Sequence, residues 1–341
     1  MGSLIAVHPT FDAVWPFAAD HLATLWLKQG PLRFVRLQHG DDRSLHEVVL
    51  DLATVERLVA LNVRVTPETI QRMPMLREAA ILHAYGANED PELKAILAAH
   101  SVRTYAQRSE GFWGQSVAEF ALALTLCALR RIPQTYAEMM HSHDVWNYDP
   151  PDGRGLPGQR GYQYGDDSRF VNGTIAGKRV RIVGAGNIGS RYASFVHMLG
   201  ADVAAWDPYA GEPGFHRSGA RRVFHLDWLM RDADIFAPML PLTQGTRGLI
   251  TRDHIYSLPR GCLIVLVTRA AICDMAAIRE RVLNDEIALA ADVFDIEPLP
   301  LDDPLLGRHN VVHTPHNAGR TRHANEQWAQ ALADQFLPVS S

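Results

Sequence analysis

The sequence is poor in the residues and segments that mark disulfide-bonded, zinc-binding and membrane proteins. It has three cysteines in 341 residues, Cys127, Cys262 and Cys273, and no Cys-x-x-Cys pair. An odd number of scattered cysteines indicates neither a disulfide framework nor a metal site. No apolar run reaches the roughly 20 residues of a membrane-spanning helix, and residues 1–11 do not have a signal-peptide pattern. We therefore expect a cytoplasmic protein without a bound metal.

The sequence also lacks an excess of positive charge. Lysine and arginine number 33 against 38 acidic residues, which gives a net charge of −5 and a pI near 6.3. Proteins that bind nucleic acid or anionic membranes present a basic stripe, so we expect neither partner. Hydrophobic residues make up 47% of the chain, and its length is typical of two domains.

Short apolar runs alternate with helical patterns along most of the chain. A Ser-x-x-Glu capping box at Ser116 and Glu119 predicts a helix that ends before Pro133. Several of the runs are apolar on both faces, as buried parallel strands are. The alternation predicts an α/β fold with doubly wound parallel sheets. The expected strands are residues 4–9, 32–38, 77–86, 101–107, 179–186, 202–208, 233–240, 262–268, 287–294 and 310–316.

One region interrupts this alternation. Residues 148–173 are rich in Gly, Pro and Asp and show no periodicity, which is unusual inside a compact domain. An irregular surface insert is one interpretation. A lid or a subunit contact is the other, because the segment also carries Tyr162, Tyr164 and Phe170.

A glycine-rich stretch indicates a dinucleotide site. Gly184, Gly186 and Gly189 form Gly-x-Gly-x-x-Gly between an expected strand and a helical pattern, and a second strand follows. That context makes the motif a dinucleotide fingerprint. The first glycine permits the tight turn, the second lets the backbone approach the pyrophosphate, and the third lets helix and strand pack closely. The N–H groups at the start of the helix then face the phosphates.

An aspartate follows the second strand of this unit. Asp207 lies eighteen residues after Gly189, where a carboxylate can accept hydrogen bonds from the adenosine ribose and would repel the phosphate of NADP. The sequence therefore favours NAD over NADP, with FAD as the rival ligand. In the alternative interpretation, Asp207 only caps the turn before Pro208.

Charged residues follow the strands of the C-terminal half. Arg269 follows an all-apolar strand, Asp292 and Glu297 come after the next, and His316 follows the last. Ligands of doubly wound sheets bind at the carboxyl ends of the strands. A guanidinium there suits a carboxylate ligand, and a carboxylate beside an imidazole makes a general acid–base pair. The stretch Asn310–His323 holds three histidines, so these residues alone do not single out the catalyst.

From about Ser116 to Thr321 the chain resembles the D-isomer-specific 2-hydroxyacid dehydrogenase family, whereas the first hundred residues match it only loosely. The motifs occur in the order of the family. They are SVAEFALALTLCALRR, GKRVRIVGAGNIG, LPLTQGTRGLI, LVTRAAICD, ALAADVFDIEPLP and TPHNAG.

The resemblance implies roles for individual residues. Arg269 would bind the substrate carboxylate, and His316 would exchange a proton with the substrate oxygen while Glu297 sustains the imidazolium. Asp292 would bind the nicotinamide carboxamide. Of the other histidines, His313 would be a core or strand-edge residue and His323 structural or solvated. Backbone N–H groups of Tyr85, Gly86 and Ala87 would hold the carboxylate, and further cofactor contacts are implied at Asn187, Ile188, Pro241 and Thr268.

The resemblance also implies an architecture and a reaction. It predicts two Rossmann-like or flavodoxin-like lobes with a cleft between them. The substrate lobe would comprise residues 1–115 and 316–341, and the NAD lobe residues 116–315, with 148–173 as an irregular insert. The reaction would interconvert a D-2-hydroxy acid and its 2-oxo acid. Family members are commonly homodimers, for which the apolar helix 117–129 is a candidate interface, although it could equally be core.

Several positions depart from the family pattern and leave the substrate open. The arginine motif reads LVTRAA, and the loop before the helix brings Arg108, Phe112 and Trp113, which could pack between the domains or line a pocket. Arg320 could be a surface charge or a second anion contact. Glu297 disfavours formate oxidation, because formate enzymes of the family carry glutamine there. A phosphite-type dehydrogenase and an NADH-sensing, corepressor-like scaffold remain as alternatives.

Overall fold

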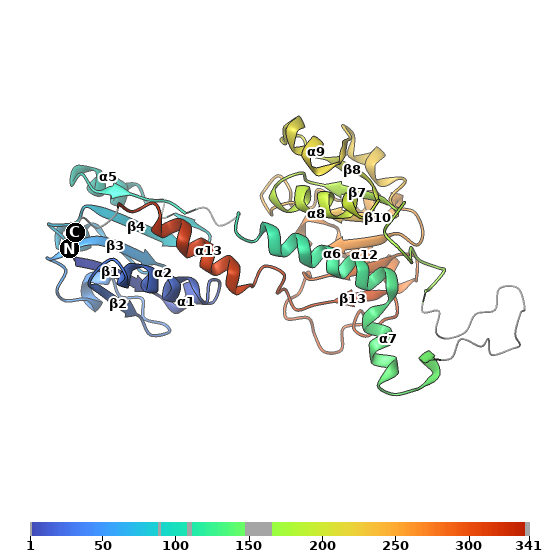
Figure 1. Cartoon of the computed structure of the whole chain (residues 1–341), viewed down its shortest axis with the longest axis horizontal. Coiled ribbons are helices and arrows are strands. Elements are labelled where there is room, and N and C mark those ends of the chain that lie inside the picture. Colours follow the sequence, from blue (N-terminus) through green and yellow to red (C-terminus); the bar gives the residue numbers. More distant parts are fainter. Residues whose placement is uncertain (1, 88–89, 108–110, 147–165, 338–341) are drawn as a thin grey trace, which may run out of the picture. The chain divides into compact units, whose positions relative to one another are not determined.

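The chain divides into two compact units. The structure is a computed structural model that describes residues 2–87, 90–107, 111–146 and 166–337. Unit 1 comprises residues 1–113 and 320–341, and unit 2 comprises residues 114–319 (Figure 1). His316, which the predicted boundary assigned to the substrate lobe, lies in unit 2. Of the predicted insert, only residues 166–173 are described, so Tyr162 and Tyr164 lie outside the described residues.

Unit 1 is built on a mainly parallel sheet. Its strand order is β2-β1-β3-β4, with β6 parallel and β5 antiparallel to β4. Along β1, Leu4 and Ala6 face one core, whereas Ile5 and Val7 face another, so both faces of the sheet are covered. The strands are β1 Gly2–Val7, β2 Leu32–Arg36, β3 Val55–Leu61, β4 Glu78–His83, β5 Gly86–Ala87 and β6 Arg103–Thr104.

The helices of unit 1 form one layer on each face of that sheet. Helix α13, which follows unit 2 in the chain, packs beside α2 (Figure 1). It contributes Trp328 to the core, and Phe336, which follows the helix, joins the same cluster. Leu45, Ile70 and Leu93 belong to the other layer. The helices are α1 Pro9–Asp12, α2 Ala18–Leu27, α3 Leu45–Val48, α4 Pro67–Gln71, α5 Pro91–Ala99 and α13 Arg322–Ala333.

Strand β3 is a central element that the sequence pattern did not predict. Glu56 and Arg57 interrupt its apolar run. Arg57 is nevertheless only 2% exposed, because its guanidinium lies 4.3 Å from the centroid of the Trp26 ring and its Nε lies 3.7 Å from a Glu78 oxygen. A charge that finds aromatic and acidic partners can occupy a buried strand, and such partners are invisible in the local sequence.

Unit 2 is built on a sheet of seven parallel strands. The order is β13-β12-β11-β10-β7-β8-β9, so the strand order reverses between β7 and β10, as in doubly wound nucleotide-binding sheets. The predicted α/β class with two parallel sheets is confirmed. The strands are β7 Arg179–Val183, β8 Asp202–Trp206, β9 Arg221–Arg222, β10 Ile235–Pro238, β11 Leu263–Leu266, β12 Ala288–Ala291 and β13 Val311–His313.

Helices cover this sheet, and α6 packs against α8 (Figure 1). Helix α6 begins at Gly114, three residues before the start that a capping box at Ser116 predicts, so Ser116 lies inside its first turn. Pro133 falls in the first turn of α7. The helices, including two of 3₁₀ type, are α6 Gly114–Arg130, α7 Ile132–Met139, η1 Asp144–Trp146, α8 Asn187–Met198, α9 Glu212–Ser218, α10 Leu226–Met230, α11 Arg252–Ser257, η2 Ala270–Ile272, α12 Met275–Leu283.

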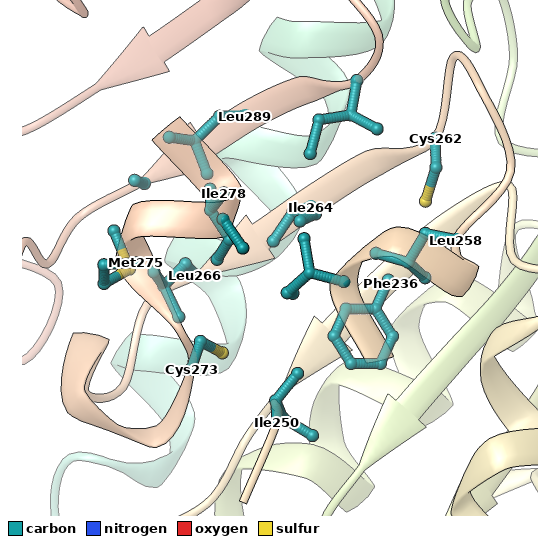
Figure 2. Close-up of a cluster of buried hydrophobic side chains, with 14 of the residues drawn as sticks. Phe236, Ile250, Leu258, Cys262, Ile264, Leu266, Cys273, Met275, Ile278 and Leu289 are labelled. Atoms are coloured by element: carbon teal, nitrogen blue, oxygen red, sulfur yellow. The ribbon is translucent and has the colours of Figure 1, made fainter. Parts of the chain in front are cut away.

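The core of unit 2 holds the strand ends in place. Phe236, Ile264 and Leu289, from three neighbouring strands, pack with Ile278 of α12 (Figure 2). Two of the three free cysteines, Cys262 and Cys273, lie in this core, while Cys127 on α6 is only partly buried. Cysteine behaves here as a small apolar residue.

Within the described part of the chain, no helix combines the length and the apolarity needed to cross a membrane.

Candidate active site

The predicted site residues of unit 2 all follow strands of one parallel sheet. Gly184 follows β7, Asp207 follows β8, and Pro241 comes after β10; Arg269, Asp292 and His316 follow β11, β12 and β13 in the same way. Parallel strands bring their carboxyl ends to the same edge of a sheet, which is where ligands bind in this architecture. The sequence spacing therefore gathers these six residues along that edge.

The glycine loop has the shape that a dinucleotide requires. Gly184 has φ of +98°, and a Cβ there would lie 2.7 Å from the carbonyl oxygen of Met239. A Cβ on Gly189 would collide with the carbonyl oxygen of Gly184. At Gly186, by contrast, a Cβ would contact nothing within 4 Å, so the chain leaves space there. This is the space that a pyrophosphate needs in front of the N-terminus of α8.

The neighbouring candidates lie where cofactor contacts are expected. Asn187 and Ile188, in the first turn of α8, are partly buried, and Asn187 lies against Gly114, where a Cβ would meet its side chain at 2.6 Å. Pro241 is exposed, and its carbonyl accepts a hydrogen bond from the Thr246 hydroxyl at 2.6 Å. Their contacts with a cofactor stay predictions.

Asp207 is held by backbone groups on both of its oxygens. One accepts from the N–H of Ala185 at 2.8 Å, and the other from the N–H groups of Tyr209 and Ala210 at 2.8 and 3.0 Å. The aspartate thus caps the turn, as the alternative interpretation held, and it also ties β8 to the glycine loop. A carboxylate accepts about four hydrogen bonds, so the caps leave capacity for a ribose hydroxyl. The ribose contact stays a prediction.

His316 and Glu297 form a hydrogen-bonded pair. Nδ1 of His316 lies 2.7 Å from one oxygen of Glu297, and the other oxygen accepts the N–H of Phe294 at 2.8 Å. Both side chains remain partly exposed, at 39% and 35%. His316 has φ of +54°, a left-handed conformation that histidine rarely adopts. Such strain concentrates at functional sites, where the surrounding structure enforces it.

A fully buried carboxylate enforces the conformation of that histidine loop. Asp292 has no solvent exposure, and its oxygens accept from the Thr314 hydroxyl at 2.6 Å and from the N–H groups of Asn317 and Ala318 at 3.0 and 2.9 Å. These bonds bracket His316 on both sides. Sequence reasoning assigned Asp292 to the nicotinamide carboxamide, which stays a prediction, and it missed this role because the bonds go mainly to backbone.

Arg269 is a partly buried cation without an acidic partner in the described residues. Its Nη1 donates to the carbonyl of Thr268 at 2.7 Å, and no described carboxylate lies within ion-pair distance. Thr268 is buried and donates to the carbonyl of Pro238 at 3.1 Å, which links β11 to β10. A guanidinium that is partly withdrawn from water favours an anionic ligand.

The substrate loop predicted in unit 1 lies at the turn between β4 and β5. Tyr85 is exposed, and the hairpin pairs His83 with Gly86. Ala84, just before the loop, is held at both backbone groups: its N–H donates to Oδ1 of Asn62 at 2.9 Å, and its carbonyl accepts Nε1–H of Trp15 at 2.7 Å. Ala87 completes β5.

Sequence reasoning missed both side chains that clamp this loop. Asn62 has a positive φ of +53°, which asparagine tolerates better than most residues. This conformation is visible only in the structure, so nothing in the sequence points to Asn62. Trp15 is fully buried and precedes the loop by about 70 residues, so its bond to Ala84 depends on the fold.

The other candidate site residues in the described part of the chain are either exposed or packed on the core of unit 1. His313 is exposed on the edge strand β13, and His323 is exposed on α13. Arg320 is also exposed. Phe112 and Trp113 pack on the core of unit 1, whereas Arg108 lies outside the described residues.

Residues 122–318 match the family model of the D-isomer specific 2-hydroxyacid dehydrogenases, NAD binding domain. Among curated relatives, D-3-phosphoglycerate dehydrogenase of Methanocaldococcus jannaschii is 30% identical over 225 residues, which are 66% of this chain and 39% of that protein. The enzyme of the same name from Bacillus subtilis is 30% identical over 224 residues, 65% of this chain and 38% of that one. The chain thus spans about two fifths of the length of the curated relatives it matches.

Solved structures resemble the whole chain in fold. A D-lactate dehydrogenase from Treponema pallidum has a TM-score of 0.65 and 19% identity, over 97% of this chain and 95% of that one. A glyoxylate reductase from Paecilomyes thermophila has a TM-score of 0.63 and 18% identity, over 98% and 94%. The fold, the glycine loop and the match over more than half of the residues lead to one conclusion: the chain belongs to the D-isomer specific 2-hydroxyacid dehydrogenase family, and unit 2 contains its NAD-binding domain.

Proposed function

We propose that the protein is an NAD-dependent oxidoreductase that interconverts a D-2-hydroxy acid and the corresponding 2-oxo acid. The observation that carries the proposal is the 2.7 Å contact between His316 and Glu297, at the sheet edge that also holds the dinucleotide loop. The NAD-binding domain supports it, because bound NAD would supply or accept the hydride in such a reaction.

His316 is the proposed proton donor and acceptor. An ionised Glu297 only accepts hydrogen bonds, so Nδ1 of the imidazole carries a proton and Nε2 is the atom left for the substrate. In reduction, Nε2–H would protonate the carbonyl oxygen of the substrate, and in oxidation Nε2 would remove that proton. Glu297 orients the imidazole through this hydrogen bond, and the bonds of Asp292 hold the loop on either side of His316.

Arg269 is the proposed carboxylate ligand. Its guanidinium has no acidic partner in the part of the chain that the structure describes, and it can bind a carboxylate through two hydrogen bonds. We propose that backbone N–H groups of Tyr85, Gly86 and Ala87 in unit 1 also bind substrate. Fixing the acid group at several points would orient the 2-carbon for hydride transfer.

The decisive experiment is NADH oxidation with a panel of 2-oxo acids, followed by chiral analysis of the product. Turnover with a D-2-hydroxy acid as product supports the proposal. Phosphite-dependent reduction of NAD without activity on 2-oxo acids would favour the phosphite-type alternative. NADH binding without turnover of any kind would favour the NADH-sensing scaffold.

We also propose a cytoplasmic homodimer. Helix α7 has no buried residue, and Ile132, Tyr136 and Met139 on it are each about half exposed or more. A contiguous apolar patch on a protein surface is a candidate association site. The inner face of α6, with Val117 and Leu124, is core, so only its outer face could contribute. Sedimentation velocity of the wild type and of Tyr136→Glu would test the dimer.

A further inference from the structure

Aromatic rings form a continuous stack beside the predicted carboxylate loop of unit 1. The ring of Trp113 lies parallel to that of Trp15, with centroids 4.5 Å apart and an angle of 7° between planes. Tyr85 lies next in line, 6.2 Å from Trp113 and tilted by 56°. Trp15 is fully buried, whereas Trp113 is partly exposed and Tyr85 is 65% exposed. The stack therefore leads from the core to the surface at the loop.

The stack is tied to the loop that is proposed to hold the substrate carboxylate. Trp15 donates its Nε1–H to the carbonyl of Ala84, the residue before Tyr85. The inner side of the stack is covered by Trp328, 5.7 Å from Trp15, so Trp15 already has its core partner. Trp113 packs on this core with one part of its ring and leaves another part exposed beside Tyr85 at the outer end of the stack.

Three uncharged side chains contact residues 84 and 85, namely Asn62, Trp15 and Trp113. A substrate with a second anionic group, such as a phosphate, is normally bound by arginine or lysine. Flat apolar groups instead stack on aromatic rings at offset or tilted geometry. The chemistry around this loop fits the second kind of ligand.

Building on the proposed function, we propose that the substrate is a 2-oxo acid with an aromatic or similarly flat, apolar side chain, which packs against Tyr85 and Trp113. The carboxylate would bind the loop backbone, and the side chain would extend over the rings. Burial of a ring against another contributes both transfer free energy and stacking. The two rings would thus determine specificity, while Arg269 and His316 would serve every 2-oxo acid alike.

The test is steady-state kinetics of the full chain with NADH and four substrates: phenylpyruvate, 4-hydroxyphenylpyruvate, glyoxylate and 3-phosphohydroxypyruvate. We expect the aromatic substrates to have the highest kcat/KM. Trp113→Ala should lower the ratio of kcat/KM for phenylpyruvate to that for glyoxylate by roughly tenfold, and Trp113→Phe should restore most of it. Tyr256→Ala, which removes a partly exposed ring from α11 of unit 2, should leave the ratio unchanged.

Three outcomes would overturn the inference. A preference for 3-phosphohydroxypyruvate or glyoxylate would overturn it while leaving the proposed function intact. An unchanged ratio in Trp113→Ala, with unfolding temperature and NADH affinity preserved, would also exclude the rings from the pocket. If Trp113→Ala does not fold, Tyr85→Ala gives the same test, because Tyr85 is exposed and contributes little to the core. No turnover of any 2-oxo acid would overturn the proposed function, and the inference with it.

Discussion

The two units place different chemistry at the carboxyl edges of similar sheets. In unit 2 the strand ends carry ionisable side chains, namely Asp207, Arg269, Asp292 and His316. In unit 1 the loop after β4 offers backbone groups at Tyr85, supported by uncharged and aromatic side chains, while the ionisable His8 and Arg36 stand at the ends of β1 and β2. Under the proposed function, proton transfer would belong to unit 2, and selection of the substrate by shape would belong to unit 1.

The family match follows the same division. Residues 122–318, which match the NAD-binding domain, lie entirely within unit 2. Unit 1 shares the fold of the solved structures, but the sequence motifs do not extend into it. A change in unit 2 should therefore affect all substrates alike, whereas a change in unit 1 should alter their relative rates.

Replacing the proposed acid–base residue should have the largest effect. His316→Asn keeps a side chain that tolerates φ of +54° but removes the imidazole, so kcat should fall by about 10²–10⁴-fold for every substrate. NADH affinity, measured by fluorescence titration, should not change. His313→Asn, on the edge strand β13, is the matched control and should remain active. Retention of most activity in His316→Asn would disprove the acid–base assignment.

Replacing the proposed carboxylate ligand should have the next largest effect. Arg269→Lys keeps the charge but loses the planar pair of donors, so kcat/KM should fall about 10–100-fold, mainly through KM. The loss should be similar for all 2-oxo acids, because they share the carboxylate. Arg320→Lys, an exposed arginine on the same chain, serves as the control. A loss in Arg269→Lys no larger than that in Arg320→Lys would disprove the role of Arg269 as a two-point ligand of the acid.

Loosening the loop clamp in unit 1 should have a smaller effect on the same reaction. In Asn62→Gly the glycine can adopt the positive φ, but the acceptor for the Ala84 N–H is lost. This loss should destabilise unit 1 by about 1–3 kcal/mol and raise KM for the 2-oxo acid. NADH affinity should be unaffected, because the cofactor loop lies in unit 2. Ser101→Gly, at another positive φ of +55°, controls for backbone strain alone. Thermal unfolding and KM provide the two readouts.

The smallest expected effect concerns acid stability. Hydrogen bonds from the buried Arg181 lower the pKa of Asp232 below its usual value of 3.8. A lowered folded-state pKa stabilises the fold above pH about 4, and this contribution is lost as the pH falls through the folded pKa. The protection of the β7 amides in unit 2 against hydrogen exchange, relative to their intrinsic exchange rates, should therefore decrease as the pH falls below about 4. Asp232→Asn should lower this protection at neutral pH and make it depend less on pH in this range.

Two buried arginines show why one strand could be predicted from the sequence and another could not. Arg57 in unit 1 and Arg181 in unit 2 are each 2% exposed, yet burial lowers the pKa of Arg57, whereas the hydrogen bonds of Asp232 and Asp202 outweigh burial and raise that of Arg181. The strand of Arg181 was predicted, because the glycine motif follows it. The strand of Arg57 was missed, because its partners come from distant segments.

In the candidate site, too, the sequence predicted the residues in motifs but not those defined by tertiary contacts. His316, Glu297, Arg269 and the glycine loop lie near recognisable motifs, and strand order then brings them to one edge. Asn62 and Trp15 were not predicted, because a side chain that holds a backbone amide leaves no spacing pattern. Asp292 was recognised as a site residue, but its bonds to the histidine loop needed the fold. Motifs in the sequence indicate the candidate reacting groups, whereas the residues that hold those groups in position are found only from the tertiary contacts.

The order of the two units along the chain has a consequence for protein synthesis. Unit 2 is one uninterrupted stretch, but unit 1 needs α13, which the ribosome makes only after unit 2. Until then, Trp15 and Trp26 lack the cover that Trp328 and Phe336 give them. The nascent chain therefore carries an open apolar layer while its middle part is already folded, a stage at which chaperones would protect it from aggregation.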